Sequence, residues 1–168
     1  MAIDLEEILS SITAYSLPEH RDSPLVIRSA KELATAVDEL VGAGNEYCSY
    51  MSVFVDDPAG VHSSYLGIGV DSDRGCGSIL FQGEDGEYYS RGTDTDCIAV
   101  CYFDFGNERT FPGNSQIEIG KLKQALIEFY DGHFRRPATV KWQVWAGLEE
   151  DAGDVSNLHT SLIDPWSS

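Results

Sequence analysis

The chain has 168 residues, of which 42% are hydrophobic, and its 28 acidic residues outnumber its 11 basic ones to give a net charge of −17. This length and hydrophobic content are typical of one globular domain, residues 1–168, and they exclude a disordered or membrane-spanning chain. So large a negative charge repels nucleic acids and anionic membranes and attracts basic partners. Solubility alone is the alternative explanation of the charge.

The N-terminal segment carries no sign of secretion. Residues 1–16 contain three acidic residues and no Lys or Arg, whereas a secretory signal begins with positive charge. No apolar run approaches the roughly 20 residues that cross a bilayer. We therefore predict a cytoplasmic protein that has neither a nucleic acid nor a membrane as a partner.

The four cysteines are predicted to be reduced, because a cytoplasmic protein rarely keeps disulfides. Cys97 and Cys101 flank a β-rich run, and residues four apart on a strand stand about 13 Å from each other, too far for one tetrahedral zinc ion. We expect no metal site. Free cysteine behaves as a small hydrophobic residue, so a buried structural role is predicted for all four: Cys48, Cys76, Cys97 and Cys101.

Two helices are predicted in the first quarter of the chain. Apolar residues recur at helical spacing over Asp4–Ala14. Ser29 and Glu32 have the spacing of a capping box, in which each side chain bonds a backbone N–H at the start of a helix. The helix that they open ends at Gly42 and Gly44, because glycine adopts the left-handed conformation that closes helices.

A third helix is predicted near the C-terminal end of the domain. Ser115 and Glu118 form a second capping box, and the helix ends near Gly132. Its apolar stripe is expected to be buried together with Trp142, and consists of Ile119, Leu122, Leu126 and Phe129.

The middle of the chain reads as a β-meander with acidic turns. Runs of β-branched and aromatic residues predict strands at Tyr50–Val55, Tyr65–Val70, Ser78–Gln82, Glu87–Arg91 and Ile98–Phe105, with a last strand at Thr139–Trp145. Asp85-Gly86 indicates a two-residue hairpin turn. The predicted fold is α+β: an antiparallel sheet, a meander of about five or six strands, with helices packed on one face and an acidic tail at 149–168.

No motif of an enzyme stands out. None of the four histidines lies beside a convincing partner, and no zinc-protease or serine-hydrolase motif occurs. The segment 71–75 is similar to the start of a calcium loop, but the twelfth position is Gln82 in place of a bidentate Glu. Of the many carboxylates, Glu128, Asp94 and Asp96 are the least implausible catalytic groups. We predict no catalytic residue, no metal and no cofactor.

The segment 107–142 resembles a known family. The residues that carry the resemblance are Phe111-Pro112, Asn114-Ser115, Ala125-Leu126, Glu128-Phe129, Arg136-Pro137 and Val140-Lys141-Trp142, and upstream the strand Leu66–Val70 and the turn Arg74-Gly75. They resemble the deaminase-associated immunity family of bacterial polymorphic toxin systems, of the "Imm-one" type. The resemblance covers roughly residues 25–145.

The resemblance implies an α+β protein encoded beside a toxin, which is often a nucleic-acid deaminase. It implies that the chain blocks this cognate toxin by tight binding that occludes the active site or the substrate groove. The negative charge agrees, because a toxin that binds nucleic acid needs a basic groove. An acidic adaptor, a chaperone or a nucleic-acid mimic that binds another basic protein is the alternative, and an enzyme with an unrecognised site is the third possibility.

The toxin-binding surface is predicted on the acidic turns of the meander. Residues 43–108 hold 12 acidic and 2 basic residues, whereas residues 109–148 hold 3 and 6. The predicted toxin-binding residues are Asp56, Asp57, Asp71, Asp73, Glu84, Asp85, Glu87, Tyr88, Asp94 and Asp96. Because the turns of a meander alternate between the two ends of the sheet, only one of these clusters is expected to face the toxin. Tyr65, Tyr88 and Tyr89 are the candidate aromatic anchors.

Overall fold

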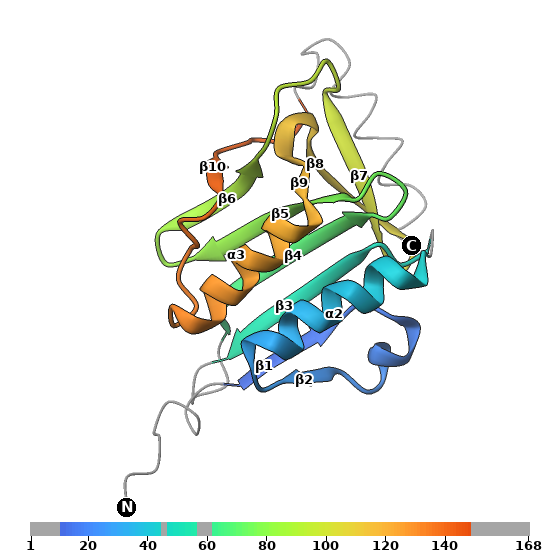
Figure 1. Cartoon of the computed structure of the whole chain (residues 1–168), viewed down its shortest axis with the longest axis vertical. Helices are drawn as coiled ribbons and strands as arrows, with labels where there is room; N and C mark the ends of the chain where they lie inside the picture. Colours follow the sequence, from blue (N-terminus) through green and yellow to red (C-terminus); the bar gives the residue numbers. More distant parts are fainter. Residues whose placement is uncertain (1–10, 45–46, 57–61, 149–168) are drawn as a thin grey trace, which may run out of the picture.

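An eight-stranded antiparallel sheet forms the centre of the fold (Figure 1). The structure is a computed structural model that describes residues 11–44, 47–56 and 62–148. The strands follow the order β10-β6-β5-β4-β3-β1-β2, and β9 pairs with β5. Their bounds are β1 (Ser11–Tyr15), β2 (Leu25–Ile27), β3 (Tyr50–Asp56), β4 (His62–Asp71), β5 (Cys76–Gly83), β6 (Gly86–Arg91), β9 (Ile117–Glu118) and β10 (Lys141–Gln143).

The strands β3 to β6 are the predicted meander, and each pairs with the next in sequence. The predicted hairpin joins β5 to β6, but its turn lies one residue earlier than expected. Gly83 pairs with Gly86, so the turn residues are Glu84 and Asp85, and Gly86 takes up a positive φ of 124° just after them. A further pair of strands, β7 (Ala99–Asp104) and β8 (Asn107–Pro112), forms a separate hairpin, whose second strand the sequence analysis missed.

Both helices of the described chain, α2 (Ala30–Ala43) and α3 (Ile119–Asp131), lie on the same face of the sheet (Figure 1). The fold class α+β is therefore confirmed. The capping box of α2 is confirmed in one half: Ser29 is the N-cap and its Oγ accepts a bond of 3.1 Å from the Glu32 N–H, but the Glu32 carboxylate accepts its bond of 2.6 Å from the N–H of Arg28, the residue before the N-cap. Gly44, at φ 54°, ends the helix. No helix among the described residues is long and apolar enough to cross a membrane.

The capping box predicted for α3 is wrong. Ser115 belongs to a buried 3-10 turn, η2 (Gly113–Ser115), and its hydroxyl bonds that of Ser78 at 2.7 Å. The short strand β9 follows and pairs with β5, which keeps the backbone extended up to Glu118. The helix therefore begins at Ile119, with Glu118 as its N-cap and no side-chain bond to cap it.

The helix predicted at Asp4–Ala14 is also wrong where the structure describes it. Ser11–Tyr15 is the strand β1, which lies between β2 and β3 in the sheet. Ile12 and Ala14 are buried, and the residues that alternate with them are at least partly exposed. This period of two is typical of a strand. Over so short a segment, the spacing of the apolar residues does not distinguish a strand from a helix. Residues 4–10 lie outside the described residues.

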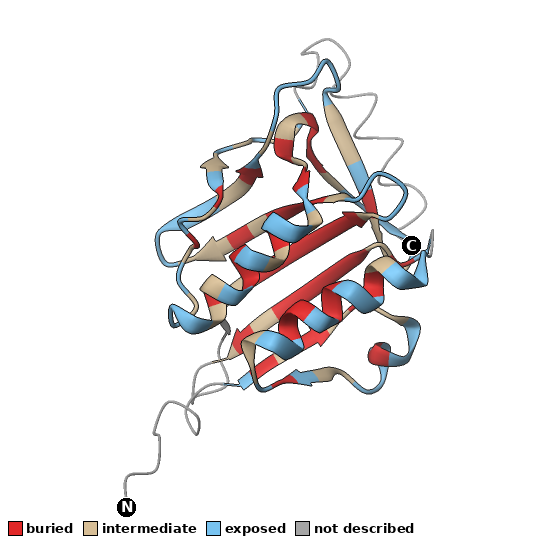
Figure 2. Ribbon diagram, in the orientation of Figure 1, coloured by how far each residue is buried: buried red, intermediate tan, exposed pale blue. Residues whose placement is uncertain are grey.

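The main hydrophobic core fills the space between the sheet and the helices (Figure 2). It contains Leu33, Val37 and Leu40 of α2 and Leu122, Ala125, Leu126 and Phe129 of α3, packed on Met51, Val53, Val55, Leu66, Ile68 and Ile79 of the strands. The predicted stripe of α3 is confirmed, except that Ile119 is only partly buried. Trp142 is also only half-buried, since its indole N–H donates to the Pro137 carbonyl over 2.6 Å at the edge of the core.

The prediction that every cysteine is buried is wrong for two of the four. Cys48 is fully buried and Cys76 partly so, and burial raises the pKa of both thiols. Cys97 and Cys101 are exposed. Cys97 precedes β7 and Cys101 lies within it. Only one face of the β7–β8 hairpin packs on the sheet, and these two thiols lie outside that contact.

The β7–β8 hairpin packs against the face of the sheet that the helices leave uncovered. Tyr102 and Phe111 of the hairpin form a second buried cluster with Tyr50 of β3. Two glycines of β4 make this contact possible: a Cβ atom at Gly69 would lie 2.1 Å from the Tyr102 ring, and one at Gly67 only 1.8 Å from the Tyr50 hydroxyl. Glycine in a strand interior is typical where another group approaches the backbone this closely.

We predict that Gly69→Ala destabilises the fold, because the methyl group would push the Tyr102 ring and the hairpin off the sheet. Overpacking of this kind costs about 1–3 kcal/mol. Gly42→Ala is the matched control: its Cβ would meet no atom within 4 Å in the exposed last turn of α2. That variant is expected to gain up to about 1 kcal/mol from helix propensity. Urea unfolding of both variants checks the sign, and a neutral Gly69→Ala would contradict the packing argument.

Candidate functional site

The predicted acidic residues divide between the two ends of the sheet. Because β3 to β6 run alternately up and down, the end of β3 and the β5–β6 turn lie at one end, and the β4–β5 turn and the end of β6 lie at the other. The first end holds Asp56, Glu84, Asp85 and Glu87, and the second end holds Asp71, Asp73, Asp94 and Asp96. Asp57 lies outside the described residues. The structure thus places four of the predicted carboxylates at each end of the sheet.

At the first end, several of these side chains already have partners within the chain. Asp85 lies 3.5 Å from Arg136, whose guanidinium stacks 3.8 Å above the centre of the Tyr88 ring. Glu87 accepts a hydrogen bond of 2.6 Å from the Gln82 amide. Tyr88 packs towards the helix-covered core, so it lies on the opposite face from Tyr65 and Tyr89.

At the second end, Asp71 and Asp73 border a hollow of about 660 Å³ between the end of α2 and β7. The Asp71 carboxylate accepts a bond of 3.2 Å from the Arg74 N–H, which closes the turn between β4 and β5. Asp94 pairs at 3.8 Å with Arg91, and both side chains are largely exposed.

One row of side chains crosses the face that the helices leave uncovered. The row has one residue on each of the strands β2, β1, β3, β4, β5 and β6. Each of these residues pairs directly with the next one on the neighbouring strand. All of them are at least partly exposed, although most lie inside the sheet. This set, the open row, consists of Val26, Thr13, Phe54, Tyr65, Gln82 and Glu87.

The neighbouring row lies closer to the β7–β8 hairpin. It contains Tyr15, Ser52, Gly67, Leu80, Tyr89 and Gln143 in register across the same sheet. Tyr15 meets Phe54 edge-on, with ring centres 5.8 Å apart, and Phe54 lies 5.1 Å from Tyr65. Farther along the row, Tyr89 meets Trp145 edge-on at 5.4 Å. Partly exposed aromatic rings therefore continue across the sheet, and such rings give large contact areas at little entropic cost.

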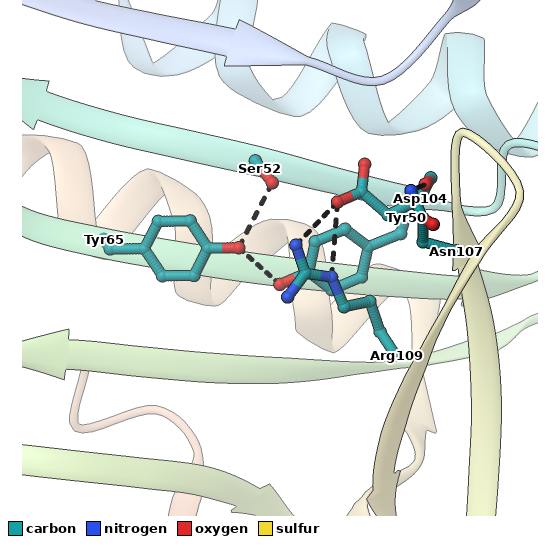
Figure 3. A network of polar contacts seen from close by, with 6 residues as sticks. All are labelled: Tyr50, Ser52, Tyr65, Asp104, Asn107 and Arg109. Carbon is teal, nitrogen blue, oxygen red and sulfur yellow. Dashed lines mark hydrogen bonds and ion pairs between the residues drawn. The ribbon is translucent and has the colours of Figure 1, made fainter. Parts of the chain in front are cut away.

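A polar network links the open row to the hairpin (Figure 3). The Tyr65 hydroxyl lies 2.5 Å from that of Tyr50 and 3.1 Å from Ser52 Oγ. Arg109 lies over the Tyr50 ring, 5.4 Å from its centre, and holds one carboxylate oxygen of Asp104 through two bonds of 2.8 and 3.2 Å. Two bonds to one oxygen fix the guanidinium of β8 above the sheet.

Burial controls the protonation of two tyrosines on this face, Tyr50 of the network and Tyr102 of β7, whose hydroxyl contacts Ser78 and Gln116. It raises the pKa of Tyr50, with Tyr65 adding to the shift, and it raises the pKa of Tyr102 to about 12. Both hydroxyls are therefore neutral at physiological pH and serve as hydrogen-bond partners. Among the described residues, no three His, Cys, Asp or Glu side chains gather as a metal ion would require. The arrangement offers aromatic surface, hydroxyls and an adjoining carboxylate, which is chemistry suited to binding.

Parts of this site were predicted from the sequence, but the row itself was not. Tyr65, Tyr89 and Glu87 were among the predicted residues, whereas Phe54, Tyr15 and the network around Arg109 were not. A signal was available in β3, where Tyr50, Ser52 and Phe54 alternate with the core residues Met51, Val53 and Val55. The period of two places one set on each face, but it does not say which face another element covers.

The raised pKa of Tyr102 predicts a loss of stability at high pH. An unfolded tyrosine ionises near pH 10, whereas folded Tyr102 holds its proton to about pH 12. The contribution of this group is thus intact below pH 10 and is lost between pH 10 and 12, with a slope of at most about 1.4 kcal/mol per pH unit. Urea unfolding of the wild-type chain and of Tyr102→Phe from pH 8 to 11 measures it. The variant is expected to lose less stability above pH 10, and parallel curves would contradict the assignment.

Comparison with known proteins identifies a family for most of the chain. Residues 21–144 match the family model described as immunity protein Imm1. The match includes both helices and every strand except β1. No curated protein matches the chain.

Proposed function

The chain belongs to the Imm1 family of immunity proteins, and from this premise we propose that it binds a cognate toxin through the open row and occludes the toxin's active site or substrate groove. Membership of the family implies a toxin as the partner. The finer parts of the proposal are that the toxin is a nucleic-acid deaminase, that the complex forms in the cytoplasm, and that the chain, as a single domain, acts by binding alone.

The observation that carries the proposal is the exposed aromatic row on the uncovered face. Phe54 and Tyr65 stand side by side within it, and Tyr15 meets Phe54 from the next row. Aromatic anchors supply most of the binding energy in protein interfaces, and charged residues around them chiefly set the rate of association and the specificity. A surface with both kinds of residue suits a protein partner.

The charge next to the row favours one of the two acidic ends. Glu87 is the last residue of the open row, Glu84 lies in the turn beside it, and Asp56 follows Phe54 on β3 by two residues, which places it on the same face. A deaminase toxin has to hold a nucleic-acid backbone in a basic groove. We therefore assign the toxin to this end, with Asp85 partly neutralised by Arg136. Asp57, Asp71, Asp73, Tyr88, Asp94 and Asp96 remain untested candidates from the sequence.

Charge reversal tests this assignment. We predict that the double variant Glu84→Lys, Glu87→Lys slows association with the toxin encoded beside the chain's gene by about tenfold or more at low salt, because it removes electrostatic steering. The control, Glu39→Lys with Asp131→Lys, makes the same charge change at exposed positions of α2 and α3. Stopped-flow association and survival of cells that express the toxin are the measurements.

The control is expected to slow association less than the variant at the open row. Equal slowing by both doubles would mean that only the net charge matters, and it would contradict the assignment to this end of the sheet. Failure of the wild-type chain to bind any toxin encoded beside it would overturn the proposed function itself.

A further inference from the structure

A second hollow of the molecule is lined by basic residues, although the chain as a whole is strongly acidic. This cleft, of about 710 Å³, lies between the start of α3, strand β9, the end of β6 and the start of β10. Four of the chain's 11 basic residues line it: Arg74, Arg91, Lys121 and Lys141. Two acidic residues, Asp94 and Glu118, also line it, so the cleft has a formal charge of +2.

The fold brings these four cations together from four elements. Arg74 lies in the β4–β5 turn, Arg91 ends β6, Lys121 is in the first turn of α3 and Lys141 begins β10. The sheet places Lys141 directly opposite Arg91. Like charges directly opposite each other in an antiparallel pair destabilise the sheet. An anion beside this pair would relieve the repulsion.

Within the part of the chain that the structure describes, these cations have few acidic partners. Arg91 lies 3.8 Å from the Asp94 carboxylate, and the Arg74 guanidinium donates a bond of 3.5 Å to the Gln116 amide oxygen. Lys121 and Lys141 form no ion pair with any residue that the structure describes. In contrast, Lys123, two residues along α3, pairs with Asp38 at 2.9 Å.

The start of α3 adds a further attraction for an anion. The N-cap residue, Glu118, makes no side-chain bond to the helix, and the first turn contains no acidic residue. The Ile119 N–H donates to the Gly75 carbonyl over 3.1 Å, but no side chain caps the helix, so the partial positive charge of its N-terminus can still attract an anion. Thr93 and Thr95, also in the lining, provide hydroxyl groups.

We propose that this cleft binds a phosphate-bearing small molecule. Its volume lies within the range of about 300–1,000 Å³ that small-molecule sites occupy. A phosphate group offers several oxygen acceptors, which matches donors that arrive from four elements, two of them arginine forks. The net charge of the chain does not prevent binding, because charges farther than the Debye length of about 8 Å are screened at physiological salt. The site lies at the opposite end of β6 from Glu87, so it is separate from the open row.

Pyrophosphate is the probe that tests the proposal. Isothermal titration of the full chain with pyrophosphate is expected to show saturable binding, which the double variant Lys121→Gln, Lys141→Gln weakens by about tenfold or more. The matched control, Lys31→Gln with Lys123→Gln, removes two positive charges outside the cleft and is expected to weaken binding by less than about threefold. Citrate, an anion with carboxylates only, is expected to bind more weakly than pyrophosphate.

Thermal unfolding gives a readout that does not depend on the variants. Pyrophosphate is expected to raise the melting temperature of the wild-type chain, because a ligand that binds only the native state stabilises it. Absence of both saturable binding and a rise in melting temperature overturns the proposal. Equal weakening by the two double variants, or citrate binding as tight as pyrophosphate binding, overturns it as well.

Discussion

The packing of two aromatic rings onto two glycines determines which part of the sheet the β7–β8 hairpin covers and which part stays exposed. Gly67 and Gly69 leave room on β4 for the Tyr50 and Tyr102 rings, and any side chain at either position would overlap them. The β7–β8 hairpin can therefore lie directly on the face opposite the helices. It covers the part of that face around Tyr50, Leu80 and Tyr89, whereas Phe54 and Tyr65 remain partly exposed.

The two faces of the sheet consequently differ in kind. The face under α2 and α3 is a continuous aliphatic core that holds the domain together. The other face is aromatic and polar, with hydroxyls held in place by Tyr50, Ser52 and Arg109. Packing fixes these side chains before any partner arrives. A partner that binds them pays little ordering entropy, which is what tight inhibition of a toxin requires.

Much of the fold was predictable because its local signals are strong. The N-cap of α2 at Ser29 and most of the apolar stripe of α3 follow from short-range patterns, and the structure contains both. The predictions that failed concern segments whose structure depends on pairing with strands that are distant in the sequence. Ser11–Tyr15 is a strand because β3 lies beside it, and Ser115 is buried against Ser78 because β9 pairs with β5.

The candidate site was predictable only in part for the same reason. The sequence identifies Glu87, Tyr65 and Tyr89 as acidic or aromatic residues of a meander, yet it gives no register. Only the register aligns Glu87 with Tyr65 and Phe54 in one row and sends Tyr88 to the other face. The basic cleft was not predictable either. Its four basic residues are far apart in the sequence, and Lys141 joins Arg91 there only because β10 pairs with β6.

Site-specific photo-crosslinking shows whether the open row faces the toxin. A photoreactive phenylalanine analogue replaces Val26 at one end of the open row, or Ile127 on the outer side of α3; the two side chains are 42% and 39% exposed. If the open row faces the toxin, the probe at position 26 crosslinks to the bound toxin and the probe at position 127 does not. Crosslinks from position 127 alone, or equally from both positions, would contradict it.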